Sequence, residues 1–328
     1  MPLTRGYIAL GTNIGDRLRH LKQAIALLER KNVLIVTASS RIYENRAIGI
    51  KEGNDFYNAV IEIYTGLSPE SLLSACQQIE SEMGRERSNV WINRIIDIDL
   101  LYLEGICVDS EHLKIPHPEI GSRDFVLKPL SELNPLIKIE GRSVLEYLSE
   151  IEPHSMSVVE AILYPDTQIN QIVAVDQNNV IGLNGKLPWS IDEDWAIFLG
   201  KTKKGLLIMG RTSFLEMIKE PNWDKDREYI VVTSHEDLVQ NKCVQFVDSV
   251  ERAIELAKSS GKTVWICGGA SIYQSTFKDT DTLYLTRIDR SFKGDTYFSD
   301  FKQFLPNLAS QINSSNDAFS YSFQIWKQ

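Results

Sequence analysis

The sequence contains little of what marks a zinc protein, a secreted scaffold or a membrane protein. Its four cysteines, in 328 residues, are scattered and show no Cys-x-x-Cys spacing, so neither a zinc site nor a disulfide framework is indicated. No apolar stretch approaches the length that spans a membrane, and the apolar residues that open the chain are too few for a signal peptide. We therefore expect a cytoplasmic protein with free thiols.

Excess basic charge and a glycine-rich dinucleotide motif are also missing. A net charge of -9 and a pI near 5.2 argue against a nucleic-acid coat or a protein that binds anionic membranes. The absence of Gly-x-Gly-x-x-Gly excludes an ordinary Rossmann dinucleotide site. We expect small-molecule partners, with no nucleic acid and no membrane, and the sequence leaves a homo-oligomer open.

The length of the chain predicts two domains rather than one. In the first half we expect strands at 7–10, 33–40, 58–64 and from 95 onward, and helices at 18–28, 69–83 and 143–151. In the second half, strands at 172–175, 206–209, 229–233, 264–267 and 283–288 alternate with helical stretches, which predicts a largely parallel sheet. We place the domains at 1–152 and 169–328, with a linker at 153–168 in which residues 158–163 could form one more strand.

Asp97 and Asp99 interrupt an apolar run that begins at Ile95, and they are the most informative feature of the chain. The run is rich in β-branched residues and predicts a strand, on which side chains two apart share a face. Two adjacent carboxylates in an apolar setting repel each other and lose hydration, so a positive charge should lie between them. A hard divalent cation held by oxygen atoms would meet this need.

Arginines lie just upstream of the two aspartates, at Arg85, Arg87 and Arg94. They supply fixed positive charge where an anionic substrate would bind. Carboxylates, a cation and arginines together indicate phosphoryl or pyrophosphoryl transfer from a nucleotide.

Other segments of the first half complete an ordered set with these residues. They are Tyr-Ile-Ala-Leu-Gly-Thr-Asn at 7–13, Phe-Tyr-Asn-Ala at 56–59, Gly-Arg-Glu-Arg at 84–87, Pro-His-Pro at 116–118 and Arg-Asp-Phe at 123–125. Over residues 7–151 this set resembles 6-hydroxymethyl-7,8-dihydropterin pyrophosphokinase. The resemblance implies a ferredoxin-like α+β domain that transfers the terminal diphosphate of ATP to the hydroxymethyl group of a reduced pterin.

The same resemblance implies roles for single residues. Asp97 and Asp99 would hold two magnesium ions and act with Arg85 and Arg94 in the reaction. The ATP would contact Gln77, Glu80, Arg87, His117 and Arg123. The pterin would contact Asn58, Phe56, Trp91 and Phe125, because flat heteroaromatic rings stack well on aromatic faces.

Two segments depart from the pattern of that family. Val-Trp-Ile-Asn at 90–93 replaces the Gly-Pro that usually precedes the arginine, and Asn-Arg-Ala at 45–47 replaces a Thr-Pro-Pro-like segment. The altered loop leaves an alternative open, in which this domain is degenerate and serves as a nucleotide-binding or interaction module beside an active second domain.

The second half has an ordered set of its own. It comprises Val-Ile-Gly at 180–182, Leu-Pro-Trp at 187–189, Ile-Met-Gly-Arg-Thr at 208–212, Thr-Ser at 233–234 and Gly-Gly at 268–269. Asp194 lies one turn before Phe198 on a predicted helix, so both face one pocket, where a lone carboxylate can bind an amidine-like ring edge. From about Gln171 onward this order resembles dihydrofolate reductase, which implies a mixed, mainly parallel sheet flanked by helices.

This second resemblance implies a folate site and an NADPH site. Folate would contact Ile172, Ala174, Trp189, Asp194, Phe198, Arg227 and Thr286. Asp194 would bind the pteridine and support protonation of its ring, Arg227 would pair with the glutamyl carboxylate, and Thr286 would hydrogen-bond Asp194. The cofactor would contact Ile181, Gly182, Leu187, Gly210, Arg211, Thr212, Ser234, Gly268, Gly269, Ala270 and Tyr273. Because Arg211 and Ser234 match positions around the 2′-phosphate, NADPH is expected over NADH.

Together these patterns predict a two-domain folate-pathway enzyme of α/β and α+β class, a pyrophosphokinase followed by a reductase. A second alternative is that the C-terminal half reduces a related pterin or pyrimidine intermediate. The combination of Arg227 with Asp194 argues against it.

Overall fold

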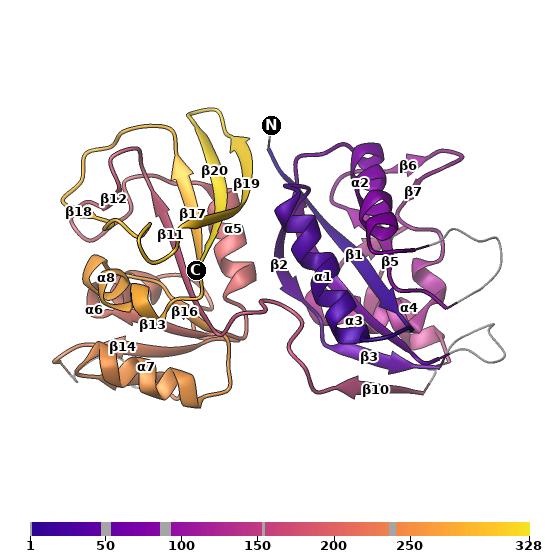
Figure 1. Ribbon diagram of the computed structural model, residues 1–328, viewed down its shortest axis with the longest axis horizontal. Coiled ribbons are helices and arrows are strands. Elements are labelled where there is room, and N and C mark those ends of the chain that lie inside the picture. Colours follow the sequence, from indigo (N-terminus) through magenta and orange to yellow (C-terminus); the bar gives the residue numbers. More distant parts are fainter. Residues whose placement is uncertain (1, 47–53, 86–92, 153–154, 236–240) are drawn as a thin grey trace. The chain divides into compact units, whose positions relative to one another are not determined.

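The computed structural model describes residues 2–46, 54–85, 93–152, 155–235 and 241–328, and the chain forms two compact units (Figure 1). The N-terminal unit runs from Leu3 to Asp166 and the C-terminal unit from Thr167 to Gln328. No helix in the described ranges is both long and apolar enough to cross a membrane.

The N-terminal unit is built on a six-stranded sheet in which all paired strands are antiparallel. The strand order is β10 (Met156–Val159), β3 (Ile42–Asn45), β4 (Phe56–Thr65), β1 (Thr4–Thr12) and β5 (Asp97–Leu103), and β2 (Ile35–Ser39) also pairs with β4. Short ladders join β6 (Val108–Asp109) to β7 (Lys114–Ile115) and β8 (Lys138–Ile139) to β9 (Arg142–Ser143).

Helices cover both faces of this sheet. Successive side chains of a strand point to opposite faces, so each face carries apolar side chains that a helix can bury. Ile8 packs in the core under α1 (Arg17–Arg30) and α2 (Pro69–Glu82), whereas its neighbour Tyr7 packs under α3 (Asp124–Leu133) and α4 (Val144–Glu150). Helix α2 begins as expected: Ser68 caps it by accepting from the backbone N–H of Ser71, and Pro69 occupies its first turn. A short 3₁₀ turn, η1 (Ile120–Ser122), precedes α3.

Most of the predicted linker belongs to the N-terminal unit, which corrects the expectation from sequence. Strand β10 pairs with β3, and Leu163, only 2% exposed, packs in the core beside α1. The Tyr164 hydroxyl donates to Glu29 at 2.7 Å, and Asp166 forms an ion pair with Lys22. Strand β3 and helix α3 were also absent from the sequence prediction, since β3 is short and Pro129 lies inside α3.

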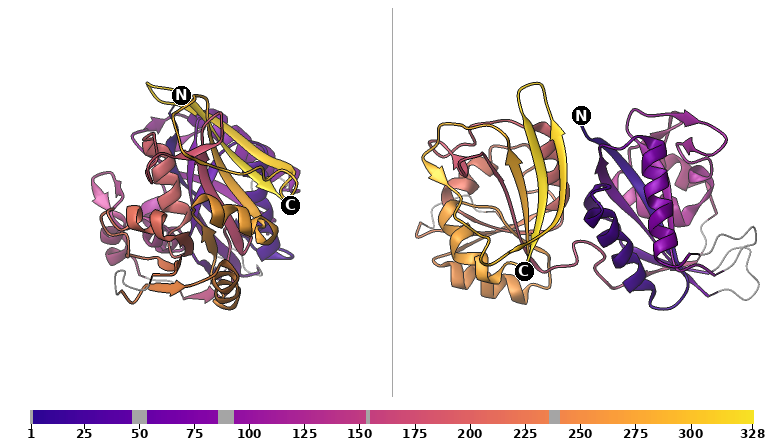
Figure 2. Two further views of the ribbon diagram at one scale, coloured as in Figure 1. Left: turned by 90° about the vertical axis from the view of Figure 1, so that its left-hand side faces the viewer. Right: turned by 45° about the horizontal axis from the view of Figure 1, so that its top comes forward.

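The C-terminal unit contains an eight-stranded mixed sheet. Its order is β15 (Val244–Val247), β14 (Glu228–Val232), β13 (Leu206–Gly210), β16 (Val264–Ile266), β11 (Ile169–Val175), β17 (Thr282–Ile288), β20 (Ser320–Lys327) and β19 (Asn307–Ser315). The pairs from β15 to β17 are parallel, and β20 and β19 are antiparallel. Figure 2 shows the β19–β20 pair, in yellow, at one edge of the sheet. Each strand expected from the sequence is present.

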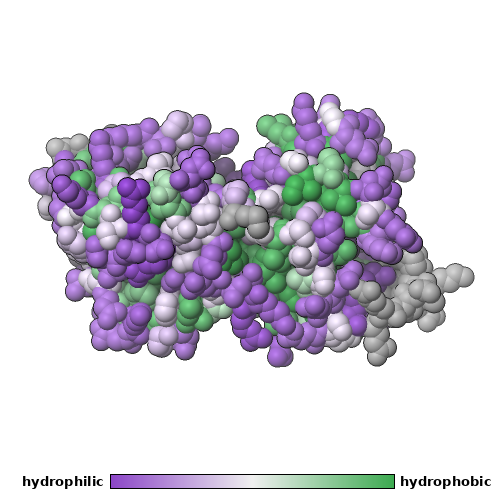
Figure 3. Space-filling view, turned by 90° about the horizontal axis from the view of Figure 1, so that it is seen from above, coloured by the Kyte–Doolittle hydropathy of each residue, from purple (hydrophilic) through white to green (hydrophobic). Residues whose placement is uncertain are grey.

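Two pairs of helices cover this second sheet on opposite faces. Side chains of α5 (Asp192–Lys201) and α6 (Arg211–Met217) pack with one core, and those of α7 (Val250–Ser259) and α8 (Ala270–Thr276) with the other. A 3₁₀ turn, η2 (Phe277–Asp279), follows α8, and β12 (Val180–Gly182) pairs with β18 (Thr296–Tyr297). In the space-filling view most exposed side chains are hydrophilic (Figure 3).

Replacement of Leu163 by alanine should destabilise the N-terminal unit, because it empties a buried site in the core beside α1. We expect the free energy of unfolding of this unit to fall by about 2–5 kcal/mol in denaturant titrations. Leu145, on α4, is 49% exposed, and Leu145→Ala should change the free energy of unfolding by no more than about 0.5 kcal/mol. Equal, small effects of both changes would show that residues after β10 are a linker after all.

Candidate active sites

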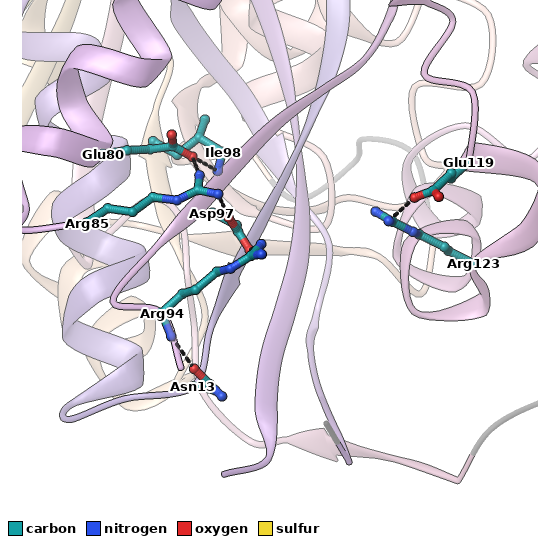
Figure 4. A network of polar contacts seen from close by, with 8 residues as sticks. All are labelled: Asn13, Glu80, Arg85, Arg94, Asp97, Ile98, Glu119 and Arg123. Carbon is teal, nitrogen blue, oxygen red and sulfur yellow. Dashed lines mark hydrogen bonds and ion pairs between the residues drawn. The ribbon is translucent and has the colours of Figure 1, made fainter. Parts of the chain in front are cut away.

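Asp97 is held between two arginines at the start of β5. Arg85 Nη2 lies 2.6 Å from one carboxylate oxygen of Asp97, and Arg94 Nη1 lies 2.6 Å from the other. Both guanidinium groups point at Asp97 in the close view (Figure 4). Arg85 is held in turn by an ion pair with Glu80 of α2, and Glu80 accepts the backbone N–H of Ile98 at 2.7 Å. The helix α2, the strand β5 and both arginines are thereby connected through carboxylates.

Arg94 is positioned from the other side by Asn13, which directly follows β1. The Asn13 side-chain oxygen accepts the backbone N–H of Arg94 at 2.6 Å, and its amide donates to Asn93 at 2.8 Å. Asn13 is 1% exposed. The segment before β5 is therefore tied to the end of β1, although residues 86–92 lie outside the described ranges.

Asp99 shares the face of β5 that Asp97 occupies, and both residues are half-buried. Burial and the charge of Asp97 raise the pKa of Asp99, and the nearby charges of His117, Arg123 and Arg85 oppose that rise. Burial lowers the pKa of His117, although the charge of Asp99 acts in the other direction. Asp99, His117 and Arg123 are therefore close enough to affect one another.

Arg123 does not join the arginines around Asp97. It forms an ion pair with Glu119 and lies apart from that cluster (Figure 4). Its guanidinium carbon is 5.8 Å from the ring centre of Phe125, in the first turn of α3. Arg123 thus lies on the α3 side of the site, and Arg85 and Arg94 lie on the α2 side.

A second group of predicted residues lies next to Asp97 across the sheet. The register pairs Gly11 of β1 with Asn58 of β4 on one side and with Asp97 of β5 on the other. A Cβ at Gly11 would lie 3.0 Å from the Asn58 side-chain oxygen and 3.7 Å from the Asp97 Cβ. Glycine therefore keeps Asn58 and Asp97 accessible to one ligand, and Phe56 begins the same strand as Asn58.

Several expected residues take other contacts, or lie outside the description. Glu80, expected beside the nucleoside, is 5% exposed and contacts Arg85 and the backbone of β5. Gln77 is half-buried one turn earlier on α2. Arg87 and Trp91, and all of residues 90–93 except Asn93, lie outside the described residues.

In the C-terminal unit, Asp194 of α5 is hydrogen-bonded to Thr286 of β17. The Thr286 hydroxyl donates to Asp194 Oδ1 at 2.5 Å. Burial raises the pKa of Asp194 to about 6, and the hydrogen bond from Thr286 limits that rise. Ala174 of β11 pairs with Thr286, and Ile172 and Phe198 pack in the same core. Trp189, just before α5, has a buried indole N–H without a partner among the described residues.

Arg227 lies at the far end of α5 from Asp194. Its Nη2 donates to the carbonyl oxygen of Leu199 at 2.7 Å, and its Nε donates to the Thr202 hydroxyl at 3.1 Å. Burial lowers the pKa of Arg227. One helix therefore positions a carboxylate at its first turn and a guanidinium at its last.

Most of the expected cofactor residues meet at the carboxyl ends of neighbouring parallel strands. The backbone N–H of Gly210, which ends β13, donates to the Gly268 carbonyl beyond β16 at 2.7 Å. Gly268 has a φ of 114°, and a Cβ there would lie 3.2 Å from Ser213 Oγ, so a glycine is required.

Other members of the set lie around this junction. Arg211 and Thr212 begin α6, Ala270 begins α8 directly after Gly269, and Ser234 lies just beyond β14, which is the neighbour of β13. The Tyr273 hydroxyl donates to the Ile172 carbonyl at 2.7 Å. Ile181 and Gly182 lie in β12, and Leu187 is exposed in the loop before α5. Ligand sites in sheets of this kind form at the carboxyl ends of the strands.

Comparison with known proteins assigns the N-terminal unit. Residues 7–135 match the 7,8-dihydro-6-hydroxymethylpterin-pyrophosphokinase family. A 2-amino-4-hydroxy-6-hydroxymethyldihydropteridine pyrophosphokinase of Bacillus subtilis is 43% identical over 137 residues, which are 42% of this chain and 82% of that protein. One from Methylorubrum extorquens is 39% identical over 158 residues, 48% of this chain and 100% of that protein. This chain belongs to the 7,8-dihydro-6-hydroxymethylpterin-pyrophosphokinase family.

The second half of this pyrophosphokinase matches another family. Residues 168–328 match the dihydrofolate reductase family. A solved structure, dihydrofolate reductase from Enterococcus faecalis complexed with NADP(H) and RAB-propyl, is 29% identical with a TM-score of 0.44 and covers 49% of this chain and 95% of that one. The chain is thus a two-domain enzyme with pyrophosphokinase and dihydrofolate reductase activities.

The residues of the pyrophosphokinase domain fit magnesium. Among the described residues no three or more His, Cys, Asp or Glu side chains are grouped to hold a metal ion. Magnesium, however, usually takes one or two carboxylates and completes its shell with water and substrate phosphates. Asp97 and Asp99 supply two carboxylates on one face of β5. Burial and the charge of Asp97 raise the pKa of Asp99 and so disfavour its ionised form, which a bound cation would stabilise.

Two residues of the pyrophosphokinase site were missed from the sequence. Asn13 was part of a recognised segment but had no role assigned to it, and only its contact with Arg94 shows one. Asn45 was noted as a departure, yet its side-chain oxygen accepts from Asn58 at 2.5 Å and so orients that amide. An asparagine at or directly after the end of a strand was the available signal.

The reductase domain should lose stability as pH rises through the titration of Asp194. Its folded pKa of about 6 exceeds the ordinary value of 3.8, so the folded state holds this proton more tightly than the unfolded chain between those pH values. Relative to Asp194→Asn, wild-type stability should fall by about 3 kcal/mol between about pH 4 and pH 7. Thr286→Val should shift the titration upward, because it removes the hydrogen bond to the carboxylate. If the difference in the free energy of unfolding between wild type and Asp194→Asn stayed the same at every pH in denaturant titrations, the raised pKa of Asp194 would be contradicted.

Proposed function

We propose that the chain catalyses two reactions of folate biosynthesis: transfer of diphosphate from ATP to 6-hydroxymethyl-7,8-dihydropterin, and reduction of 7,8-dihydrofolate by NADPH. One observation in each unit carries the proposal: the aspartate expected from the family resemblance is held in place by neighbouring side chains. Asp97 lies between two arginines, and Asp194 accepts a hydrogen bond from the hydroxyl of Thr286. A ferredoxin-like class for the N-terminal unit is supported by its antiparallel sheet and its chain order β1–α1–β2–β3–β4–α2–β5, in which β2 and β3 both pair with β4.

In the pyrophosphokinase domain Asp97 and Asp99 would hold the two magnesium ions that accompany ATP. When bound, magnesium supplies positive charge against the phosphate oxygens. Arg85 and Arg94 already neutralise Asp97 in this arrangement, and their guanidinium groups suit phosphate as well as carboxylate. Both arginines would turn to the triphosphate as it binds, and Arg123 with His117 would contact it from the α3 side.

The pterin would lie on the other side of Gly11 from the metal site. Phe56 and Phe125 would stack on its faces, and Asn58, oriented by Asn45, would hydrogen-bond its edge. The absence of a side chain at Gly11 gives the hydroxymethyl group a route toward the phosphates near Asp97. The residue arrangement thus favours direct transfer between two bound substrates.

In the reductase domain the nicotinamide supplies the hydride. Asp194 would bind the pteridine edge with both carboxylate oxygens, and a pKa of about 6 lets it exchange a proton near neutral pH. Ile172, Ala174 and Phe198 would line the ring, and Arg227 would pair with the glutamyl carboxylate at the end of α5. Around the Gly210–Gly268 contact, the backbone would approach the cofactor diphosphate.

The two reactions should be separable by single substitutions. Asp194→Asn should lower dihydrofolate reduction by roughly 100-fold or more and leave diphosphate transfer intact. Asp97→Asn should do the reverse, since the sites lie in separate cores without shared partners. Diphosphate transfer would be followed by mass spectrometry and dihydrofolate reduction by the oxidation of NADPH. A chelator of magnesium should stop only the diphosphate transfer. Loss of both activities in one folded variant would contradict the proposal, and ATP binding without any transfer in wild type would favour the degenerate alternative.

Arg211 should determine the choice of cofactor. Arg211→Ala should weaken the binding of NADPH at least roughly tenfold more than the binding of NADH, because only NADPH offers a 2′-phosphate to the guanidinium. Arg252→Ala, at an exposed arginine of α7, should change neither the KM for NADPH nor the KM for NADH. Steady-state KM values for both cofactors provide the measurement, and equal weakening of the two would show that Arg211 is structural.

A further inference from the structure

Asn45 and Asn58 are amide side chains on the neighbouring strands β3 and β4. The register pairs Asn45 with Phe56 and Asn58 with Tyr43, so the two amides lie diagonally on one face of the sheet. Asn45 is 6% exposed, and its backbone also pairs with Met156 of β10 on the other side. Strands on both sides therefore hold Asn45 in place, although it lies in a segment that departs from the pattern of the pyrophosphokinase family.

One backbone carbonyl sets the direction of both amides. A carbonyl oxygen can only accept, so Asn45 Nδ2 donates to the Arg46 carbonyl at 3.0 Å. The Asn45 Oδ1 atom is then left to accept, and Asn58 Nδ2 donates to it at 2.5 Å. A reversed Asn58 amide would bring two oxygen atoms together at this distance with no proton between them. The contacts from Arg46 through Asn45 therefore allow one orientation of Asn58.

This orientation leaves the oxygen of Asn58 available to a ligand. Asn58 is half-buried, and its Oδ1 accepts no hydrogen bond in the ranges that the structure describes. A Cβ at Gly11 would lie 3.0 Å from this oxygen, so the oxygen borders the space that a side chain at Gly11 would occupy. At this point the sheet presents an acceptor, and not a donor, to a bound ring.

We propose that Asn45 is a positioning residue, which makes Asn58 select rings that carry an N–H group at this point. A 2-amino-4-oxo ring such as a pterin has a lactam N–H beside its amino group. A 2,4-diamino ring has a bare nitrogen there, which is an acceptor, and an amide held by Asn45 cannot turn to donate to it. Two acceptors then face each other, and the ring is rejected. The inference rests on the proposed pyrophosphokinase function and adds a basis for its choice of ring.

The test compares 6-hydroxymethyl-7,8-dihydropterin with its 4-amino analogue as substrates of the full-length enzyme, with ATP and magnesium. Diphosphate transfer to each ring is followed by mass spectrometry, with the ring in large excess over the enzyme. Wild type should favour the pterin, and Asn45→Leu should lower the ratio of the two kcat/KM values by roughly threefold to tenfold, the range of one hydrogen bond. Because the released Asn58 can turn, kcat/KM for the analogue should rise. A role in stability alone would lower both kcat/KM values and leave their ratio unchanged.

A second variant covers the case in which leucine disturbs the fold. Asn45→Thr places a residue that suits strands at this position, and its hydroxyl can donate as well as accept. It therefore does not choose the direction of the Asn58 amide, and it should also lower the ratio. Asn45→Asp keeps an oxygen that accepts from Asn58 and should preserve the ratio.

Two further variants show whether Asn45 acts through Asn58. Asn134→Leu makes the same substitution at an amide that donates to the Tyr7 hydroxyl, and it should leave the ratio unchanged. In an Asn58→Ala background, Asn45→Leu should have no further effect on the ratio. A ratio that stays at the wild-type value in folded Asn45→Leu and Asn45→Thr would overturn the inference. Failure of wild type to transfer diphosphate to either ring would instead refute the proposed pyrophosphokinase function.

Discussion

Both active sites depend on one constraint: a carboxylate withdrawn from water must be given a partner, and the kind of partner sets its chemistry. Arg85 and Arg94 hold Asp97 with full positive charges. Asp194 receives the neutral hydroxyl of Thr286, and its pKa rises to about 6. The first arrangement places the carboxylate beside two guanidinium groups, which suit phosphate as well as carboxylate. The second keeps a group that can gain or lose a proton near neutral pH.

Glycines at strand junctions make both arrangements accessible. Gly11 separates Asn58 from Asp97 across three adjacent strands, and any Cβ would fill the space between them. Gly268 takes a positive φ and lets one strand end contact the next through Gly210. In both units the backbone would therefore form part of the proposed binding surface, and the sheets fix where these glycines lie.

Residues in long, regular elements were predictable, and residues fixed by distant contacts were not. The spacing of Asp97 and Asp99 gave their shared face on β5, and the parallel strands of the second sheet followed from their alternation with helices. Strand β10 was predicted as part of a linker because its stability comes from pairing with β3, which local sequence does not encode. The contacts of Glu80 and Asn13 likewise depend on partners many residues away.

The anchoring of residues 163–166 determines where the N-terminal unit ends along the chain. Leu163, Tyr164 and Asp166 are fixed to the N-terminal unit, and Thr167 already hydrogen-bonds to Asn170 at the start of β11. Asp166 and Thr167 are consecutive residues, so the chain passes from one unit to the next with a contact on each side of the boundary. A flexible linker, by contrast, is a stretch of residues that lacks such contacts.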